Sequence, residues 1–333
     1  MRLRASLESW LVARWYGPRP VHALLPLAWL FGALSGLRRW LYRRSLLKAE
    51  VRVLPVLVVG NLTVGGAGKT PTVLALIEGL RARGWRPGVI SRGHGGVVRS
   101  ASLLPERPDP SLFGDEPSLI RGRSRVPVAV ARRRCEAAAL LERSGDVDLL
   151  IADDGLQHYA LARDVEVLVV DGQRRYGNGA LLPAGPLREP LARAEACAAR
   201  ICNGGSAQPG EWAMQLEAQP LRGLVDGVPA PAPGARVHAV AGIANPSRFF
   251  DSLRELGFDP IEHPFPDHHA FGPPDLQFSD DLPVLMTEKD AVKCARFATA
   301  RCFYVPVRAR LPEALLDLLH ARLTAAQDSR GYR

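Results

Sequence analysis

Residues 60–70, Gly-Asn-Leu-Thr-Val-Gly-Gly-Ala-Gly-Lys-Thr, have the residue types that bind the phosphates of a nucleotide. Glycines let backbone N–H groups approach phosphate oxygens without a Cβ in the way. A lysine here would bring positive charge to the β- and γ-phosphates, and the following threonine hydroxyl would contact Mg²⁺. The predicted nucleotide-binding residues are Thr63, Val64, Gly65, Gly66, Ala67, Gly68, Lys69 and Thr70.

This loop departs at one position from the pattern G-x-x-x-x-G-K-[ST], since Thr63 stands where the first glycine is usual. The additional Gly65 and Gly66 make a variant of the loop plausible. The alternative is a glycine-rich turn that ends in Gly-Lys-Thr by chance. The apolar run before the loop and the helical spacing after it favour a phosphate-binding loop.

Acidic residues at the end of a second apolar run form the next group. Asp153 and Asp154 follow the apolar residues 149–152, as expected for a strand that presents carboxylates to a metal ion beside a phosphate-binding loop. The rigid, proline-rich loop 183–190 carries Arg188 and Glu189, which could face the phosphates. We therefore predict a Mg²⁺ site close to the nucleotide.

Other polar groups are less specific. Asp115, in Gly-Asp-Glu-Pro, could simply cap a helix, and Arg92 lies in a glycine-rich loop after a short apolar run. His268 lies in Pro-Asp-His-His, and a single loop histidine is usually exposed and inert. The segment Thr-Glu-Lys-Asp at 287–290 is similar to base-recognition motifs, but four polar residues are weak support.

Strand-like and helix-like segments alternate along the chain, which predicts a P-loop NTPase-type, doubly wound and mainly parallel α/β sheet with a smaller C-terminal α/β lobe. Glycine pairs and an Ala/Pro run indicate a connection between lobes. The expected parts are a membrane-interface segment (1–48), a nucleotide-binding lobe (49–205), a linker (206–235) and a smaller lobe that closes on the active site (236–330).

Most of the net positive charge lies in the first 48 residues. Nine of the Arg and Lys residues occur there with Glu8 as the only acid, which accounts for +8 of the net +9. The remaining 285 residues are nearly neutral, so the charge does not indicate a nucleic-acid-binding groove. No pattern indicates a protein partner.

The same N-terminal segment is rich in tryptophan and leucine. Taken as a helix, residues 21–37 would extend about 25 Å, short of the roughly 30 Å hydrocarbon core, with Pro26 expected to bend it. Arginines on both sides and no small-residue cleavage site argue against a signal peptide. We expect an element that lies on membrane lipids; the alternatives are a true span or a helix packed on the protein's own core.

The five cysteines form neither a C-x-x-C pair nor a zinc-like cluster with histidine. An odd number of scattered cysteines indicates reduced, mostly buried thiols. We therefore expect neither a disulfide nor a zinc site.

Taken together, the polar blocks resemble the tetraacyldisaccharide 4′-kinase (lipid A 4′-kinase) family. They occur in family order, and their combination is far more specific than the phosphate-binding loop alone. The blocks are 60–71, 91–93, 114–117, 153–158, 163–164, 177–179, 182–186, 203–205, 267–268 and 287–293.

The resemblance implies transfer of the ATP γ-phosphate to the 4′-hydroxyl of a tetraacylated glucosamine disaccharide 1-phosphate (lipid A disaccharide 1-phosphate). It also implies Mg²⁺ as cofactor and a peripheral or monotopic position on the cytoplasmic face of the inner membrane. Matched to the family, Lys69 and Thr70 are the loop lysine and Mg²⁺-binding hydroxyl. Asp115 is the group that activates the sugar hydroxyl, and His268 is its partner.

The family pattern also places the acids Asp153, Asp154 and Glu189 near the metal, and it makes Arg92, Gln157, His158 and Arg188 candidates for contacts with the substrate. One residue departs: His94 stands where the family usually has tyrosine after Ser-Arg-Gly. Two other functions stay open on the residues alone. They are a membrane-bound nucleotide switch with a protein partner, and a P-loop kinase or ligase acting on a soluble metabolite.

Overall fold

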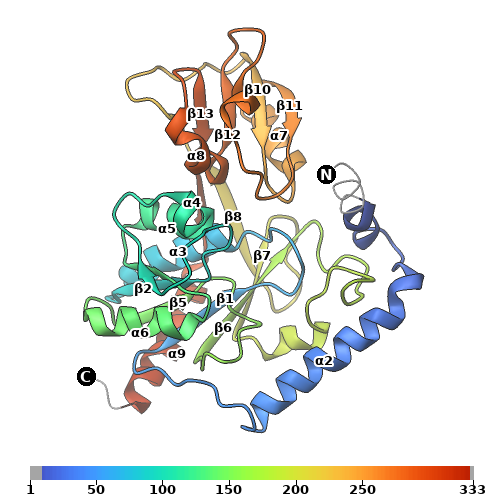
Figure 1. The fold of residues 1–333 in the computed structure, drawn as a ribbon, viewed down its shortest axis with the longest axis vertical. Coiled ribbons are helices and arrows are strands. Elements are labelled where there is room, and N and C mark those ends of the chain that lie inside the picture. The colour runs from blue at the N-terminus through green and yellow to red at the C-terminus, as the bar shows by residue number, and fades with distance from the viewer. Residues whose placement is uncertain (1–9, 331–333) are drawn as a thin grey trace.

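Apolar, β-branched runs form the parallel strands at the centre of the larger lobe. The computed structural model describes residues 10–330 and places nine strands in one sheet, in the order β14-β8-β7-β6-β1-β5-β2-β4-β3 (Figure 1). All neighbours pair in parallel except the edge pairs β3–β4 and β8–β14. The strands are β1 (Val56–Gly60), β2 (Pro87–Ser91), β3 (Ser102–Leu103), β4 (Val128–Val130), β5 (Leu149–Ala152), β6 (Val165–Asp171), β7 (Ala199–Asn203), β8 (Trp212–Ala218) and β14 (Val307–Arg310).

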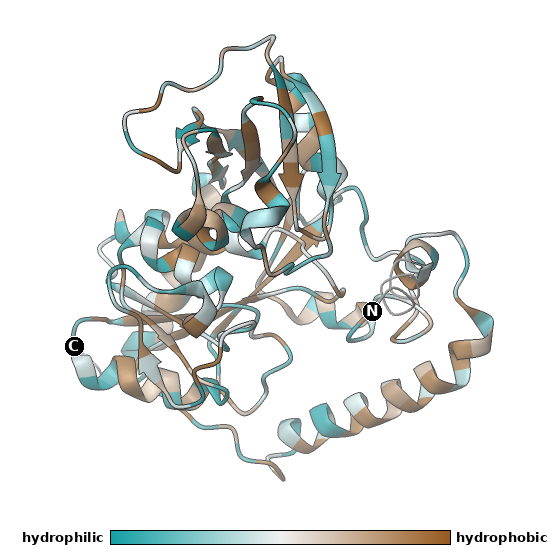
Figure 2. Ribbon diagram, turned by 45° about the horizontal axis from the view of Figure 1, so that its top comes forward, coloured by the Kyte–Doolittle hydropathy of each residue, from teal (hydrophilic) through white to brown (hydrophobic). Residues whose placement is uncertain are grey.

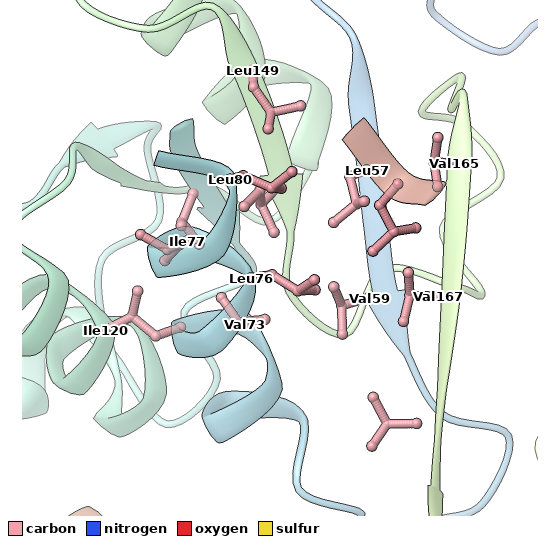
Figure 3. Close-up of a cluster of buried hydrophobic side chains, with 14 of the residues drawn as sticks. Leu57, Val59, Val73, Leu76, Ile77, Leu80, Ile120, Leu149, Val165 and Val167 are labelled. Carbon is pink, nitrogen blue, oxygen red and sulfur yellow. The ribbon is translucent and has the colours of Figure 1, made fainter. Parts of the chain in front are cut away.

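Helices cover this sheet and complete its core. The helix after the phosphate loop, α3, buries Val73, Leu76, Ile77 and Leu80, which share one face at helical spacing. Figure 3 shows these side chains facing Leu149 of β5, Leu57 and Val59 of β1 and Val165 and Val167 of β6, with Ile120 beside them. The helices around this lobe are α3 (Lys69–Arg81), α4 (Pro110–Phe113), α5 (Asp115–Ser124), α6 (Arg134–Ser144), η2 (Leu191–Ala196) and α9 (Glu313–Ser329).

A second, five-stranded sheet forms the smaller lobe, above the first in Figure 1. Its order is β11-β10-β12-β13-β9, and only β9 is antiparallel to its neighbour. Its elements are β9 (Arg222–Gly223), β10 (Arg236–Ala241), α7 (Pro246–Glu255), β11 (Asp259–Pro264), η3 (Pro273–Leu276), β12 (Val284–Thr287), α8 (Glu288–Cys294), η4 (Ala295–Phe297) and β13 (Cys302–Val305). The predicted class, a mainly parallel α/β fold with a smaller second lobe, is confirmed.

The boundary of the smaller lobe differs from the prediction of residues 236–330. After β13 the chain returns to the larger sheet, where β14 pairs with β8 and α9 packs. Within the predicted linker 206–235, β8 belongs to the larger sheet and β9 to the smaller one. Two short connections, residues 219–221 and Pro306, therefore join the lobes.

The two motif-bearing strands of the larger lobe are direct neighbours, since β1 pairs with β5 in register. The phosphate loop follows β1 and the acidic pair follows β5, so both leave the same edge of the sheet. In open α/β sheets the carboxyl ends of the strands, near a reversal of strand order, are where ligands bind. Strand pairing alone thus brings the two predicted groups together.

The N-terminal helix α2 (Leu25–Arg43) follows a short turn, η1 (His22–Leu24), and lies apart along the larger lobe (Figure 1). Pro26 occupies its first turn and does not bend it, because a first-turn proline breaks no helical hydrogen bond. The helix extends to Arg43, beyond the predicted residue 37. Within residues 10–330, no helix combines the length and apolarity needed to cross a membrane. The first nine residues of the predicted 1–48 segment lie outside the described part.

The two faces of α2 differ. Gly32 lies against Leu181, and Arg39 forms an ion pair with Glu189 at 3.7 Å. The helix is apolar along most of its length (Figure 2), and its opposite face leaves large apolar side chains in solvent, with Trp29 at 69% exposure. Its exposed apolar residues are Leu27, Trp29, Leu30, Leu34, Leu37 and Trp40.

Candidate active site

The phosphate loop joins β1 to α3 with a backbone that only glycine adopts easily. Gly65 and Gly68 have φ values of 103° and 92°, and a Cβ on Gly68 would lie 2.1 Å from Asn203 Nδ2. That amide donates a hydrogen bond to the Ala67 carbonyl at 3.0 Å and holds the loop against the end of β7. The loop is therefore fixed before any ligand binds.

Lys69 begins α3, and its ammonium group lies in a polar network of the larger lobe. It donates to Asn61 Oδ1 at 3.2 Å and lies 3.5 Å from Asp154. The side chain is only 9% exposed. Thr70 is partly exposed and lines a cavity of about 640 Å³ between the lobes, a volume in the range of ligand pockets.

The acids after β5 differ sharply in charge state. Burial, together with the nearby carboxylates of Glu116 and Asp154, raises the pKa of Asp153 to about 7. Burial would also raise the pKa of Asp154, but Lys69 and Arg188 outweigh that effect and lower it to about 2. Asp154 is thus a carboxylate at neutral pH, whereas Asp153 takes up a proton far more readily.

Asp153 is the acid whose surroundings fit a metal ion. Both of its carboxylate oxygens are buried without a hydrogen-bond partner among residues 10–330. No cluster of three or more His, Cys, Asp or Glu side chains in that range could hold an ion by itself. Mg²⁺ typically binds through one or two carboxylates plus substrate phosphates, so this donor set fits Mg²⁺ bound with a nucleotide.

Glu189 and Asp154 have other partners in this arrangement. Glu189 is 2% exposed and accepts hydrogen bonds from Tyr159 and from Gln157 Nε2, the latter at 3.2 Å. Asp154 pairs with Arg188 at 3.2 Å as well as with Lys69. To bind a metal ion, Glu189 and Asp154 would have to give up some of these hydrogen bonds and ion pairs. Their roles as metal ligands therefore stay predictions.

The structure brings Asp115 and His268 together from different lobes. Asp115 is the first residue of α5, and His268 Nδ1 lies 3.6 Å from its Oδ2, beyond hydrogen-bond distance. His268 has a φ of 61° in the loop after β11, and its Nδ1 is buried without a partner among the described residues. Asp115 and His268 are thus adjacent but do not form a hydrogen bond with each other.

Two lysines of α8 surround this pair. Lys289 Nζ donates to Glu116 Oε1 at 3.1 Å and lies 3.4 Å from His268 Nε2. Lys293 Nζ lies 3.9 Å from the same Asp115 oxygen that faces His268. Both lie in the block 287–293 noted in the sequence, but the sequence gave no reason to assign them this position.

The other residues predicted from the sequence occupy different positions around the active site. His94 packs edge-on against His268 with ring centroids 5.1 Å apart, whereas Arg92 is exposed. Burial lowers the pKa of His158 to about 4, aided by nearby arginines, so this side chain is neutral at pH 7. Gln157 donates to the Asn61 carbonyl at 3.2 Å.

Sequence reasoning missed several residues that position the site. Arg134 Nη2 donates to the backbone carbonyls of Asp153 and Asp154, at 3.0 and 2.8 Å. Arg248 of α7 donates to Asn203 Oδ1 at 3.3 Å and so links the smaller lobe to the phosphate loop. A lone arginine on a helix has no local signal for such contacts. Asn203 lies in the block 203–205 noted in the sequence, but no role was assigned to it there.

Comparisons with known proteins agree on one family. The family model described as tetraacyldisaccharide-1-P 4′-kinase (LpxK) matches residues 21–324. The tetraacyldisaccharide 4′-kinase of Aeromonas salmonicida is 52% identical over 93% of this chain and 95% of its own length. That of Methylobacillus flagellatus is 46% identical over 96% and 97%. A crystal structure of "apo" form LpxK from Aquifex aeolicus in complex with ATP matches with a TM-score of 0.75 and 27% identity, covering 91% of this chain and 99% of that one.

Proposed function

This chain belongs to the tetraacyldisaccharide-1-P 4′-kinase family, and on that premise we propose how its two lobes share the reaction. The protein is an ATP-dependent kinase of lipid A biosynthesis that phosphorylates the 4′-position of a tetraacylated disaccharide 1-phosphate. The observation that carries the proposal is the meeting of Asp115 and His268 across the lobes, beside a phosphate loop that the larger lobe holds through Asn203.

Asp115 is the proposed general base. A sugar hydroxyl has a pKa far above 7, so a nearby group must accept its proton as the new P–O bond forms. Asp115 Oδ2 lies 3.6 Å from His268 Nδ1 and 3.9 Å from Lys293 Nζ, and these two side chains would fix its direction. His268 is the proposed positioning residue, because it acts through Asp115.

The larger lobe holds the donor. Phosphoryl transfer depends mainly on positioning and charge stabilisation, so the backbone amides of residues 63–68 and the Lys69 ammonium group would bind the β- and γ-phosphates. Lys69 would leave Asp154 for the phosphates, and Arg188 would then keep Asp154 neutralised. Arg134 fixes the backbone of the acidic pair throughout.

The proposed Mg²⁺ ligands are Asp153 and Thr70, joined by Asp154 and Glu189 if they exchange partners. When bound, Mg²⁺ neutralises charge on the phosphates and orients them. Asp153 must be deprotonated to act as a ligand. Its buried, unpartnered oxygens support this role.

Closure of the lobes would complete the acceptor side. The 3.6 Å separation of Asp115 and His268 shortens to a hydrogen bond with a small movement about residues 219–221 and Pro306. Two hydrogen bonds already join the lobes, from Arg248 to Asn203 and from Lys289 to Glu116. They would keep the lobes in register during that movement.

We propose that α2 carries the enzyme on the cytoplasmic face of the inner membrane. Its outward leucines and tryptophans would enter the interface, while Arg38, Arg43 and Arg44 would meet anionic lipid. Arg39 points the other way and ties the helix to Glu189. An acylated acceptor in the bilayer would thereby reach a site that takes ATP from the cytosol.

The test of the reaction uses purified full-length protein in detergent with γ-labelled ATP, Mg²⁺ and lipid A disaccharide 1-phosphate. We expect label in the lipid product and its loss in Asp115→Asn, with ATP binding retained. Labelled lipid formed at the normal rate by Asp115→Asn would remove Asp115 as the base. ATP hydrolysis without labelled lipid would indicate a nucleotide switch or a different acceptor.

The test of the membrane face is sedimentation with vesicles containing anionic phospholipid. Leu30→Glu combined with Leu34→Glu should reduce the bound fraction at least tenfold, because both side chains would enter the interface. The matched control, Leu103→Glu on β3, replaces another exposed leucine and should leave binding unchanged. Equal binding by all three proteins would contradict the role of α2.

A further inference from the structure

A second cavity, separate from the active site, lies on the other side of α5. It has a volume of about 750 Å³ and is lined by both lobes. The larger lobe contributes α5 and the loop before α4, and the smaller lobe contributes β9, α8 and β13. It shares only Leu119 and Glu288 with the cavity of about 640 Å³ that holds Lys69 and Thr70. We refer to it as the arginine cavity.

Five arginines line this cavity with two glutamates, a net charge of +3. Arg121 donates to backbone carbonyls, and Arg123 pairs with Glu288. The other three, Arg107, Arg125 and Arg222, have no side-chain hydrogen bond or ion pair within residues 10–330, and all are exposed. These three arginines line the cavity together with Glu288, on which the Arg222 charge acts, and the excess of positive charge is the usual electrostatic setting of an anion site.

A buried hydroxyl gives independent support. Ser118 on α5 is 3% exposed and lines the cavity, yet its Oγ has no hydrogen-bond partner among the described residues. A buried hydroxyl without a partner is unfavourable, and a helical serine usually bonds to its own backbone. A rotation of this side chain toward the cavity would let a ligand oxygen satisfy it. Tyr304 from β13 adds a second hydroxyl to the lining.

The position of the cavity, taken with the proposed membrane face of α2, argues against the lipid bilayer as the source of the anion. In Figure 1, α2 lies on the opposite side of the larger lobe from α5, and α8 lies in the smaller lobe above it, so α2 is far from the two helices that line the cavity. A protein resting on the membrane through α2 would leave the cavity facing water. A soluble anion is therefore the fitting occupant.

We propose that the arginine cavity is a binding site for a soluble, multiply charged anion of the phosphate class, which bridges α5 of the larger lobe to β9 of the smaller lobe. Arg123 and Arg125 lie at one end of this bridge and Arg222 at the other. Because α5 begins at Asp115 and α8 carries Lys289, an occupant would hold together the two helices that meet at the acceptor side. The site itself does not depend on the proposed reaction, but the choice of a soluble anion rests on the proposed membrane face of α2.

The test is calorimetric titration of full-length protein in detergent with inorganic pyrophosphate, at constant ionic strength. A saturating, non-hydrolysable ATP analogue fills the phosphate loop, so that only other sites are measured. We expect one binding event per chain. Arg107→Gln and Arg222→Gln should each weaken it about tenfold, since each removes a charge-assisted hydrogen bond. Ser118→Ala should weaken it a few-fold.

The matched control is Arg322→Gln, which neutralises an exposed arginine on α9 that has no partner among the described residues. Its affinity for pyrophosphate should stay within twofold of the unmodified protein. Absence of binding beyond the nucleotide site, or equal affinity in all variants, would overturn the proposal. Lost vesicle binding in Arg222→Gln with unchanged pyrophosphate affinity would identify a lipid headgroup and overturn the assignment to a soluble anion.

Discussion

The donor side and the acceptor side of the active site are built differently. On the donor side, Lys69 contacts Asn61 and Asp154 at 3.2 and 3.5 Å, and all three residues belong to the larger lobe. On the acceptor side, Asp115 and His268 come from different lobes and lie 3.6 Å apart. The donor side is thus in place before substrate binds, whereas the acceptor side is assembled by movement of the lobes.

The connectivity of the chain explains this difference. The phosphate loop and the acidic pair follow strands that are neighbours in one sheet, so backbone hydrogen bonds fix their separation. Asp115 and His268 are held relative to one another only through lobe contacts such as Lys289 with Glu116. Substitutions on the two sides should therefore change different kinetic constants.

Replacement of Lys69 should have the largest effect. Lys69→Ala removes the cation that stabilises charge on the transferred phosphoryl group, and kcat should fall about a thousandfold. Steady-state kinetics with labelled ATP measures this loss, and thermal unfolding controls for folding. A loss of less than tenfold in a folded variant would show that the backbone amides suffice and that Lys69 is not part of the preformed donor side.

Replacement of the base should affect the acceptor side alone. Asp115→Asn keeps the size of the side chain but cannot accept the proton, so kcat should fall by a few hundredfold. The Kd of ATP should change less than twofold, because the donor side does not include Asp115. Equilibrium binding of a fluorescent ATP analogue measures this Kd. A large loss of ATP affinity would show that the two sides are not separate.

The positioning residue should have a smaller effect and can be tested against its neighbour. His268→Gln removes the group that faces Asp115, and kcat should fall about twentyfold with a shifted pH profile. The control is His269→Gln, since His269 pairs with Asp275 at 3.1 Å and does not contact Asp115. A merely structural role would lower activity without moving the pH profile. Equal losses in both variants would contradict a specific role for His268.

The donor side lies within one lobe and the acceptor side comes from two lobes, and this difference explains which parts of the site the sequence could predict. The phosphate loop and the acidic pair were predictable because each is a local pattern at the end of an apolar strand. The pairing of Asp115 with His268 came from the family resemblance, since no local pattern relates residues from two lobes. Their contact in this structure agrees with that expectation, while their catalytic roles stay predictions.

The boundaries of the lobes were not predictable for a related reason. β13 and β14 are nearly continuous in sequence and look like one strand over 303–307. Pro306 separates them, because it lacks the N–H needed to continue a ladder, and the chain passes there from one sheet to the other. Which sheet receives β14 depends on its pairing with β8, a long-range contact.

The smallest expected effect concerns protonation within the donor side. Burial and nearby carboxylates raise the pKa of Asp153 to about 7, so below that pH a bound proton competes with Mg²⁺ for the carboxylate. With ATP analogue bound, the apparent affinity for Mg²⁺ should fall about eightfold between pH 7.5 and 6.0, whereas Asp154, with a pKa of about 2, stays charged across that range. Calorimetric titration at both pH values measures this change.

Two variants separate Asp153 from general effects of pH. Asp148→Asn, at the other end of β5, should keep the eightfold change, because Asp148 contacts Arg86 and not the site. Asp153→Asn should bind Mg²⁺ weakly at both values and lose the pH dependence. An affinity independent of pH in the unmodified protein would mean that Asp153 is not a ligand. The donor side would then hold Mg²⁺ through Thr70, Asp154 and the phosphates, and its Asp153 would be a buried acid that serves the fold.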